Sequence, residues 1–303
     1  MKDKTQKVCK SRRDVVLGAL AAGAGAAMMP NAMAQSVMPV LPVPQKHGVA
    51  KVTSEFLMFD DPVAKLHAHL RMERDLAEQS DTLTWYNWIV FMVPVTKAPI
   101  PLVRYEGIEF SYLRHLGDNN FRIHAHNLSY ARDLESGQFT NSVKNPVTGE
   151  LITVSPSVLL SDPGTVHNPI GFRNVNGNGV YQKPYSMFRR EDELIKLDSV
   201  RGAPPEMPVT HQENSCAWCP FDEFTNSSIT SLPQHFVGSY LYEYPKWLNM
   251  GERPGHLMAM FDGKKVSSVE ELPDEFLDRT RREYPDLLRP RWEDFKKPLS
   301  FKL

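Results

Sequence analysis

Three side chains suited to acid–base chemistry alternate along one extended segment. Arg122, His124 and His126 stand two positions apart, so in a β-strand they share one face while the apolar residues between them share the other. An arginine could hold an anionic group, and a histidine could transfer a proton near neutral pH. We take these three as candidate catalytic residues and expect them to face an enclosed interior. That expectation requires a helix to cover the apolar face of the strand.

The same segment allows two other interpretations. Two histidines in this spacing could bind one metal ion if a third ligand lies near, and the candidates are His211, Glu213 and His235. Arg122 on the same strand face would repel a cation. Alternatively, the three side chains form a strand face that lies in water. Metal content therefore stays open, and no organic cofactor is expected.

Cys216 and Cys219 form the one close cysteine pair in the sequence. In an exported chain such a pair is a disulfide candidate, because export leads to an oxidising compartment. Free thiols, or a metal or redox role, are the alternatives. A thioredoxin-like role would require a βαβ context that the sequence does not show.

Aromatic residues gather in two segments that are expected to be strands. One contains Trp85, Tyr86, Trp88 and Phe91, and the other has tyrosines at alternate positions from Tyr240 to Tyr244. Such faces could hold a hydrophobic or aromatic ligand. They could equally be ordinary strand-forming core residues.

Composition excludes several classes of protein. The 303 residues are 41% hydrophobic and 23% charged, with a formal net charge of −1, so the chain is neither disordered nor a strongly basic nucleic-acid binder. The sequence contains no nucleotide-binding glycine motif and no G-x-S-x-G nucleophile motif. We expect a small-molecule ligand and no nucleic-acid partner.

The first 34 residues resemble an export signal. Six basic residues precede a short apolar run over residues 15–29, which Pro30 ends. Ala32-Met33-Ala34 then supplies the small-x-small pattern of a cleavage site, so cleavage is expected to leave Gln35 first. Arg12-Arg13 before the run indicates the twin-arginine translocation machinery, and an ordinary secretory signal is the alternative. The segment holds six basic and two acidic residues, so the remainder has 29 basic and 34 acidic residues and a net charge of −5. We expect a periplasmic or secreted protein with no membrane span in the mature chain.

Beyond the signal, the pattern predicts a proline-rich tether over residues 35–49 and a single domain over residues 50–303. Asp61 as N-cap and Pro62 at the first position predict a helix to about Glu78, and a second helix is expected over 273–284. Between them lie segments with strand composition, separated by turn residues such as Gly117-Asp118-Asn119-Asn120. The expected strands are 83–93, 102–116, 121–132, 151–158, 180–190, 194–200, 237–244 and 256–261, with a turn at Asp262-Gly263.

Closely spaced strands joined by hairpin turns favour an all-β fold. We expect an antiparallel barrel, lipocalin-like in outline, with one helix before it and one after. A barrel of this size can enclose one ligand.

Two blocks of motifs carry a resemblance to a known family. The first runs through Tyr130-Ala-Arg-Asp133, Ser136-Gly137, Asn145-Pro-Val-Thr-Gly-Glu150 and Asp162-Pro163. The second runs through Trp247-Leu-Asn-Met-Gly251, Arg253-Pro-Gly255, Gly263-Lys264-Lys265 and Glu271-Leu272-Pro273. The chain resembles domain of unknown function 1838, an uncharacterised bacterial family. Two residues, rather than the family's one, separate Tyr130 from Asp133, and the resemblance implies no activity.

Three functions are consistent with the sequence. The first is an exported, cofactor-independent enzyme that acts on a small hydrophobic or aromatic metabolite, with Arg122 as anion clamp and His124 or His126 as acid–base residue. The second is a non-catalytic protein that binds a small molecule in the same cavity. The third is a metal-dependent barrel enzyme.

Overall fold

The computed structural model describes residues 53–78, 80–160, 164–174, 185–202 and 212–289. By its contacts the chain divides into Met1–Ala50 and Lys51–Leu303, and every described residue belongs to the second unit. The export signal and the tether therefore lie outside the described residues. No helix in the described ranges is long and apolar enough to cross a membrane.

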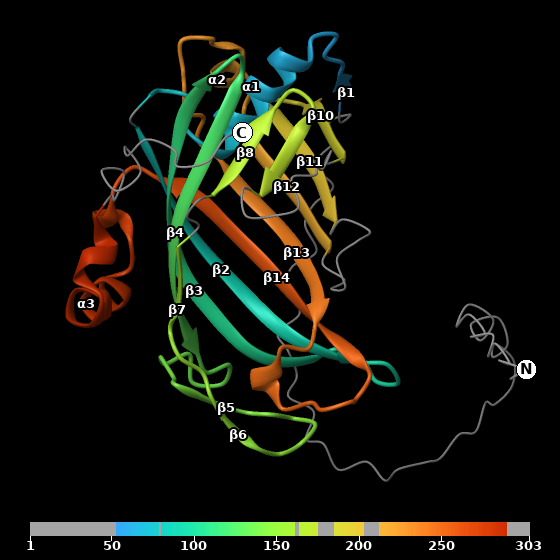
Figure 1. Cartoon of the computed structure of the whole chain (residues 1–303), viewed down its shortest axis with the longest axis vertical. Helices are drawn as coiled ribbons and strands as arrows, with labels where there is room; N and C mark the ends of the chain where they lie inside the picture. The colour runs from blue at the N-terminus through green and yellow to red at the C-terminus, as the bar shows by residue number, and fades with distance from the viewer. Residues whose placement is uncertain (1–52, 79, 161–163, 175–184, 203–211, 290–303) are drawn as a thin grey trace, which may run out of the picture. The chain divides into compact units, whose positions relative to one another are not determined.

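One large antiparallel sheet dominates the fold (Figure 1). Its longest strands are β2 (Asp81–Pro94), β3 (Ile100–Gly117), β4 (Asn120–Arg132), β13 (His235–Glu243) and β14 (Gly255–Val266). The other strands in this sheet are β1 (Ser54–Leu57), β7 (Ser157–Leu160), β8 (Thr165–Asn168), β9 (Gly171–Asn174), β10 (Tyr185–Glu191), β11 (Leu194–Gly202) and β12 (Gln212–Pro220). β5 (Ser142–Lys144) and β6 (Leu151–Thr153) form a separate hairpin.

The sheet follows the order β1-β10-β11-β12-β13-β14-β2-β3-β4-β8-β9, and β7 also pairs with β4. The predicted all-β antiparallel fold with helices before and after the main strands is confirmed. Within the described ranges no pairing joins β1 to β9, so these strands do not close into the barrel that the sequence suggested.

The β3–β4 turn shows how local sequence sets the topology. Gly117, Asp118 and Asn119 have φ values of 87°, 50° and 56°, in the left-handed region that glycine and asparagine tolerate best. The predicted hairpin turn at this position is confirmed. It aligns β3 and β4 over most of their length.

Other strand predictions need correction. Asp262-Gly263 is not a turn, because β14 continues through both residues to Val266. Residues 151–158 do not form one strand but contribute to β6 and β7. β12 was not predicted, because the polar and cysteine-containing segment from Gln212 lacks the β-branched residues that mark a strand.

Helix α1 (Pro62–Glu73) begins as predicted, since the Asp61 side chain accepts a hydrogen bond from the Val63 amide at 2.9 Å. It ends at Glu73, before the expected Glu78. Leu66 and Leu70 pack with Phe121 and Ile123 of β4. The apolar stripe of the helix thus meets the apolar face of the strand, as expected.

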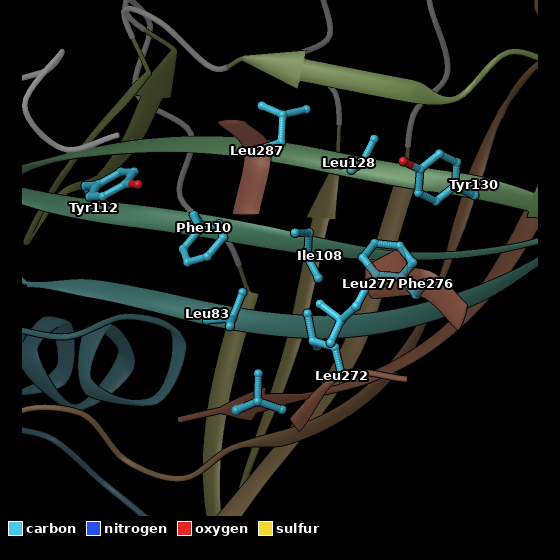
Figure 2. Packing of buried hydrophobic residues seen from close by; sticks show 11 residues of the cluster. Leu83, Ile108, Phe110, Tyr112, Leu128, Tyr130, Leu272, Phe276, Leu277 and Leu287 are labelled. Atoms are coloured by element: carbon cyan, nitrogen blue, oxygen red, sulfur yellow. The ribbon is translucent and has the colours of Figure 1, made fainter. Parts of the chain in front are cut away.

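Helix α3 (Asp274–Glu283) lies on the opposite face of β3 and β4 (Figures 1 and 2). Phe276 is fully buried, and its ring lies 4.9 Å from that of Trp85 and 5.4 Å from that of Tyr130. Figure 2 shows Phe276 and Leu277 over the strands beside Ile108 and Tyr130. The short helices are α2 (Phe221–Thr225), η2 (Lys246–Leu248), η3 (Val269–Glu271) and η4 (Pro285–Leu288).

Candidate functional site

A cavity of about 390 Å³ lies against one face of the sheet, here called the inner face. Strands from both halves of the strand order contribute to it, and the end of α1 adds Glu73 and Arg74. Alternation along each strand sends every second side chain toward this cavity. The other face, which carries α3, is here called the outer face.

Aromatic rings form much of the cavity wall. The rings of Tyr240 and Phe261 lie 4.6 Å apart, and the ring of Trp88 lies 6.4 Å from that of Tyr240. A Cβ at Gly238 would stand 2.3 Å from the Phe261 ring. This position therefore needs glycine to leave room for the ring, and the wall can hold a flat apolar body.

A buried ionic cluster borders the cavity where α1 ends. Oε1 of Glu73 accepts hydrogen bonds from Nη2 of Arg201 at 2.5 Å and from Nε2 of His69 at 3.1 Å. Burial opposes ionisation of Glu73, but Arg201 and His69 together hold the pKa of this carboxyl well below its usual range. Arg74 pairs with Glu109 at 3.0 Å on the same side. Glu73 is therefore ionised at neutral pH.

Two tyrosines face carboxylates across neighbouring strands. Tyr240 pairs directly with Glu213 in the β12–β13 register, and both side chains line the cavity. Burial, reinforced by Glu213, raises the pKa of Tyr240, and burial with Glu109 raises that of Tyr86. Both phenols therefore stay protonated and can donate hydrogen bonds.

Several polar atoms of cavity-lining residues are buried without a hydrogen-bond partner in the described part of the chain. They include Oγ of Ser199, Nε1 of Trp88, Nε of Arg74 and Nε of Arg201. Ser199 as a whole is only 3% exposed. Buried polar groups in proteins are nearly always hydrogen-bonded, because an unsatisfied group costs free energy. At this cavity, these groups could form hydrogen bonds with a polar molecule.

The three predicted catalytic residues lie on the other side of β4. Asn127 lines the cavity, whereas His126 pairs with Phe110 in the register and shares the outer face with it. Arg122 and His124 follow the same alternation. The expectation that these side chains face the cavity is wrong, because α1 covers the apolar face of β4 from the inner side and leaves the polar face on the outer side.

Arg122, His124 and His126 are nevertheless not a solvated surface, since their exposed fractions are 2%, 3% and 0%. The His126 ring lies 5.1 Å from that of Phe110 and 6.2 Å from that of Tyr112. Burial excludes the alternative of a strand face in water. A part for these residues in a reaction stays an untested prediction.

The metal interpretation gains no support from the described residues. Glu213 lines the inner cavity while His124 and His126 face outward, and His235 is exposed with its ring 5.9 Å from that of Trp218. His211 lies outside the described residues. The described side chains contain no cluster of three or more histidine, cysteine or acidic residues that could hold a metal ion.

Cys216 and Cys219 are free thiols, which contradicts the predicted disulfide. Both lie within β12, and their separation of three residues sends their side chains to opposite faces of the strand. Burial raises the pKa of Cys216 to about 11 and that of Cys219 to about 12. Neither thiol is activated as a nucleophile.

The aromatic segments divide between the two proposed roles. Tyr86, Trp88 and Tyr240 line the cavity, whereas Trp85 packs under α3. Tyr242 and Tyr244 belong to a neighbouring apolar cluster. The core interpretation thus holds for part of each segment, and the ligand-binding interpretation stays a prediction for the residues that line the cavity.

Sequence reasoning missed the ionic cluster. Glu73 was placed inside a longer helix, and Arg201 was one residue beyond a predicted strand, 128 positions away in sequence. No local pattern indicates that pair. Glu213 had been considered only as a metal ligand, although its alternation with Ser215 and Ala217 along β12 could have indicated a shared inner face.

No protein-family model matches the chain, and no curated protein matches it. The resemblance to domain of unknown function 1838 therefore stays a prediction. Among solved structures, the chain shows a weak similarity to Rv2717c from M. tuberculosis, with 11% identity and a TM-score of 0.16 over 59% of this chain and 89% of that one. A similarity at this level carries no conclusion about fold or function.

Proposed function

We propose that this protein binds a small molecule with an aromatic or apolar body and hydrogen-bonding substituents in the inner cavity. The observation that carries the proposal is the combination of aromatic walls with buried polar atoms that have no hydrogen-bond partner among the described residues. A ligand that supplied hydrogen bonds to Ser199 and Trp88 would offset the cost of burying those groups. Like a lipocalin-type barrel, the curved sheet would then enclose one ligand.

The experiment is native mass spectrometry of the protein purified from its own host. We expect a retained small molecule in the wild type and its loss in Ser215→Phe, because a phenyl group at this cavity-lining position occupies the space. Asn214→Phe is the matched control, since Asn214 neighbours Ser215 on β12 but points to the other face. Equal retention in Ser215→Phe and the control would exclude the inner cavity as the site.

A second candidate function is acid–base catalysis on the bound molecule. Glu213 and Tyr240 stand opposite each other at the cavity wall, and the raised pKa of Tyr240 keeps its phenol protonated. Such a pair can accept a proton at one point of a substrate and donate one at another. This candidate relocates the predicted cofactor-independent enzyme from Arg122, His124 and His126 to the inner cavity.

The catalytic candidate is tested with the retained compound as substrate. Tyr240→Phe and Glu213→Gln should each lower kcat at least 100-fold, in line with the usual contribution of a general acid or base. Both variants should still retain the compound. If both variants converted the compound at the wild-type rate, Glu213 and Tyr240 would not be catalytic residues, and the proposal of a binding protein would remain.

A further inference from the structure

Two phenylalanine rings that line the inner cavity lie over glycines of the neighbouring strand. β13 and β14 run side by side (Figure 1), and their register pairs Phe236 with Gly263 and Gly238 with Phe261. A Cβ at Gly238 would stand 2.3 Å from Cζ of Phe261, and a Cβ at Gly263 would stand 2.3 Å from Cζ of Phe236. Each ring therefore occupies the space that a side chain on the opposite strand would fill, and both rings lie low on the sheet.

Together with a tyrosine, these two rings form a continuous aromatic surface. The ring centroids of Phe236 and Phe261 are 6.0 Å apart, and those of Phe261 and Tyr240 are 4.6 Å apart. All three side chains line the inner cavity. We call Phe236, Tyr240 and Phe261 the aromatic floor. Its separations are those at which aromatic rings attract one another in offset-stacked or edge-to-face arrangements.

The strands beside the aromatic floor carry small side chains. Ser215 and Ala217 of β12 pair with Gly238 and Phe236 of β13, and Ser199 of β11 pairs with Ser215. All three small residues line the cavity of about 390 Å³. Space therefore remains next to the floor, and hydroxyl groups border that space.

We propose that the aromatic floor selects a planar, fused-ring aromatic compound with a hydrogen-bonding group at its edge, and that Phe236 and Phe261 determine this selectivity. The inference rests on the proposed function, because it names the ligand class of the same cavity. A planar aromatic ligand can stack on one ring of the floor and contact the next ring edge to face. A saturated ring system with the same skeleton is thicker and has no π face, so it loses these contacts.

The test compares two probes by isothermal titration calorimetry on the full chain. One probe is 2-naphthol, and its matched partner is decahydro-2-naphthol, which keeps the carbon skeleton and the hydroxyl group but has no aromatic ring. We expect one 2-naphthol to bind per chain and the saturated alcohol to bind about tenfold more weakly, as the loss of two aromatic contacts implies. Equal affinities for the two probes would overturn the proposal.

Two variants assign the selectivity to the aromatic floor. Phe236→Leu and Phe261→Leu each remove one ring but keep an apolar side chain of similar size, so both should fold. Each should lower the preference for 2-naphthol about threefold, measured as the ratio of the two dissociation constants. Phe91→Leu is the matched control, since Phe91 pairs with Met258 on the outer face and its replacement should leave the ratio unchanged. An unchanged ratio in both floor variants would refute the role of these rings.

The inference and the proposed function fail separately. Ser215→Phe fills the inner cavity and should abolish binding of both probes. If both probes bind equally well and Ser215→Phe abolishes both, the selectivity is refuted while the cavity remains the binding site. If neither probe binds the wild type, the inference is refuted, and the compound retained in native mass spectrometry still decides the proposed function.

Discussion

Glu73 is the acceptor that joins α1 to the sheet at the inner cavity, through Arg201 and His69. Its side chain is only 16% exposed, so removal of its charge leaves the Arg201 guanidinium poorly solvated and without the carboxylate that pairs with it. Glu73→Gln should lower the free energy of unfolding by about 3 kcal/mol at pH 7, the cost of breaking a buried ion pair. Urea denaturation measures it, with Glu252→Gln in an exposed loop as the control.

The difference in unfolding free energy between wild type and Glu73→Gln depends on pH, because folding lowers the pKa of Glu73. The folded pKa of Glu73 lies below the unfolded value of about 4.3, so the pair adds stability above that pH and loses it as the pH falls through the folded pKa. The difference in unfolding free energy between wild type and Glu73→Gln should therefore shrink as the pH falls below about 4. If that difference in unfolding free energy grew as the pH fell, it would contradict the lowered pKa of Glu73 in the folded protein.

The cysteines give a prediction about reactivity. Because burial raises the pKa of both thiols, Cys216 and Cys219 should react with iodoacetamide at pH 8 much more slowly than they do in the unfolded chain. The measurement is intact-mass analysis over time in a Cys9→Ser background, which removes the third cysteine. If neither Cys216 nor Cys219 can be alkylated after the protein is unfolded without a reductant, the two residues form a disulfide after all.

At the scale of elements, α3 depends on one aromatic anchor. Phe276 is fully buried between Trp85 and Tyr130, and Phe276→Ala should cost about 3–5 kcal/mol of stability through lost burial and the cavity left behind. Asp278→Ala on the exposed face of the helix is the control. Chemical denaturation followed by circular dichroism checks both. A cost under about 1 kcal/mol for Phe276→Ala would mean that α3 is not docked as described.

Elements with local signals could be predicted from sequence, and those that depend on distant partners could not. Asp61 and Pro62 mark the start of α1, and the turn residues from Gly117 mark the β3–β4 hairpin. Asn145 likewise forms a turn, with Oδ1 accepting from the Val147 amide at 2.8 Å. By contrast, the hydrogen bond from its Nδ2 to the Leu248 carbonyl at 2.9 Å joins two motif blocks that no local pattern connects.

The face of β4 illustrates the same limit at the candidate site. The alternation of side chains along a strand correctly separates Arg122, His124 and His126 from the apolar residues between them. It does not say which of the two strand faces is turned toward the cavity. The answer depends on α1, which packs on Phe121 and Ile123 from the cavity side. The outer face of β4 is also buried, since Arg122, His124 and His126 are at most 3% exposed. Burial of these residues therefore does not show that they face the cavity.

At the scale of the whole molecule, we propose that the chain is exported. The basic start, the short apolar run and Ala32-Met33-Ala34 should lead to cleavage that leaves Gln35 first. N-terminal sequencing of the exported protein checks this, and Lys replacement of Arg12 and Arg13 together should block export if the twin-arginine route is used. A mature protein that keeps Met1 would contradict the prediction.

We propose that the inner cavity, and not the outer face of β4, is the place where this protein binds a small molecule. A crystal structure of the protein purified from its own host tests it most directly. We expect electron density for an organic molecule against Trp88 and Tyr240, with a polar atom within hydrogen-bonding distance of Ser199. Density for such a molecule beside His124 and His126, with only water in the inner cavity, would contradict it.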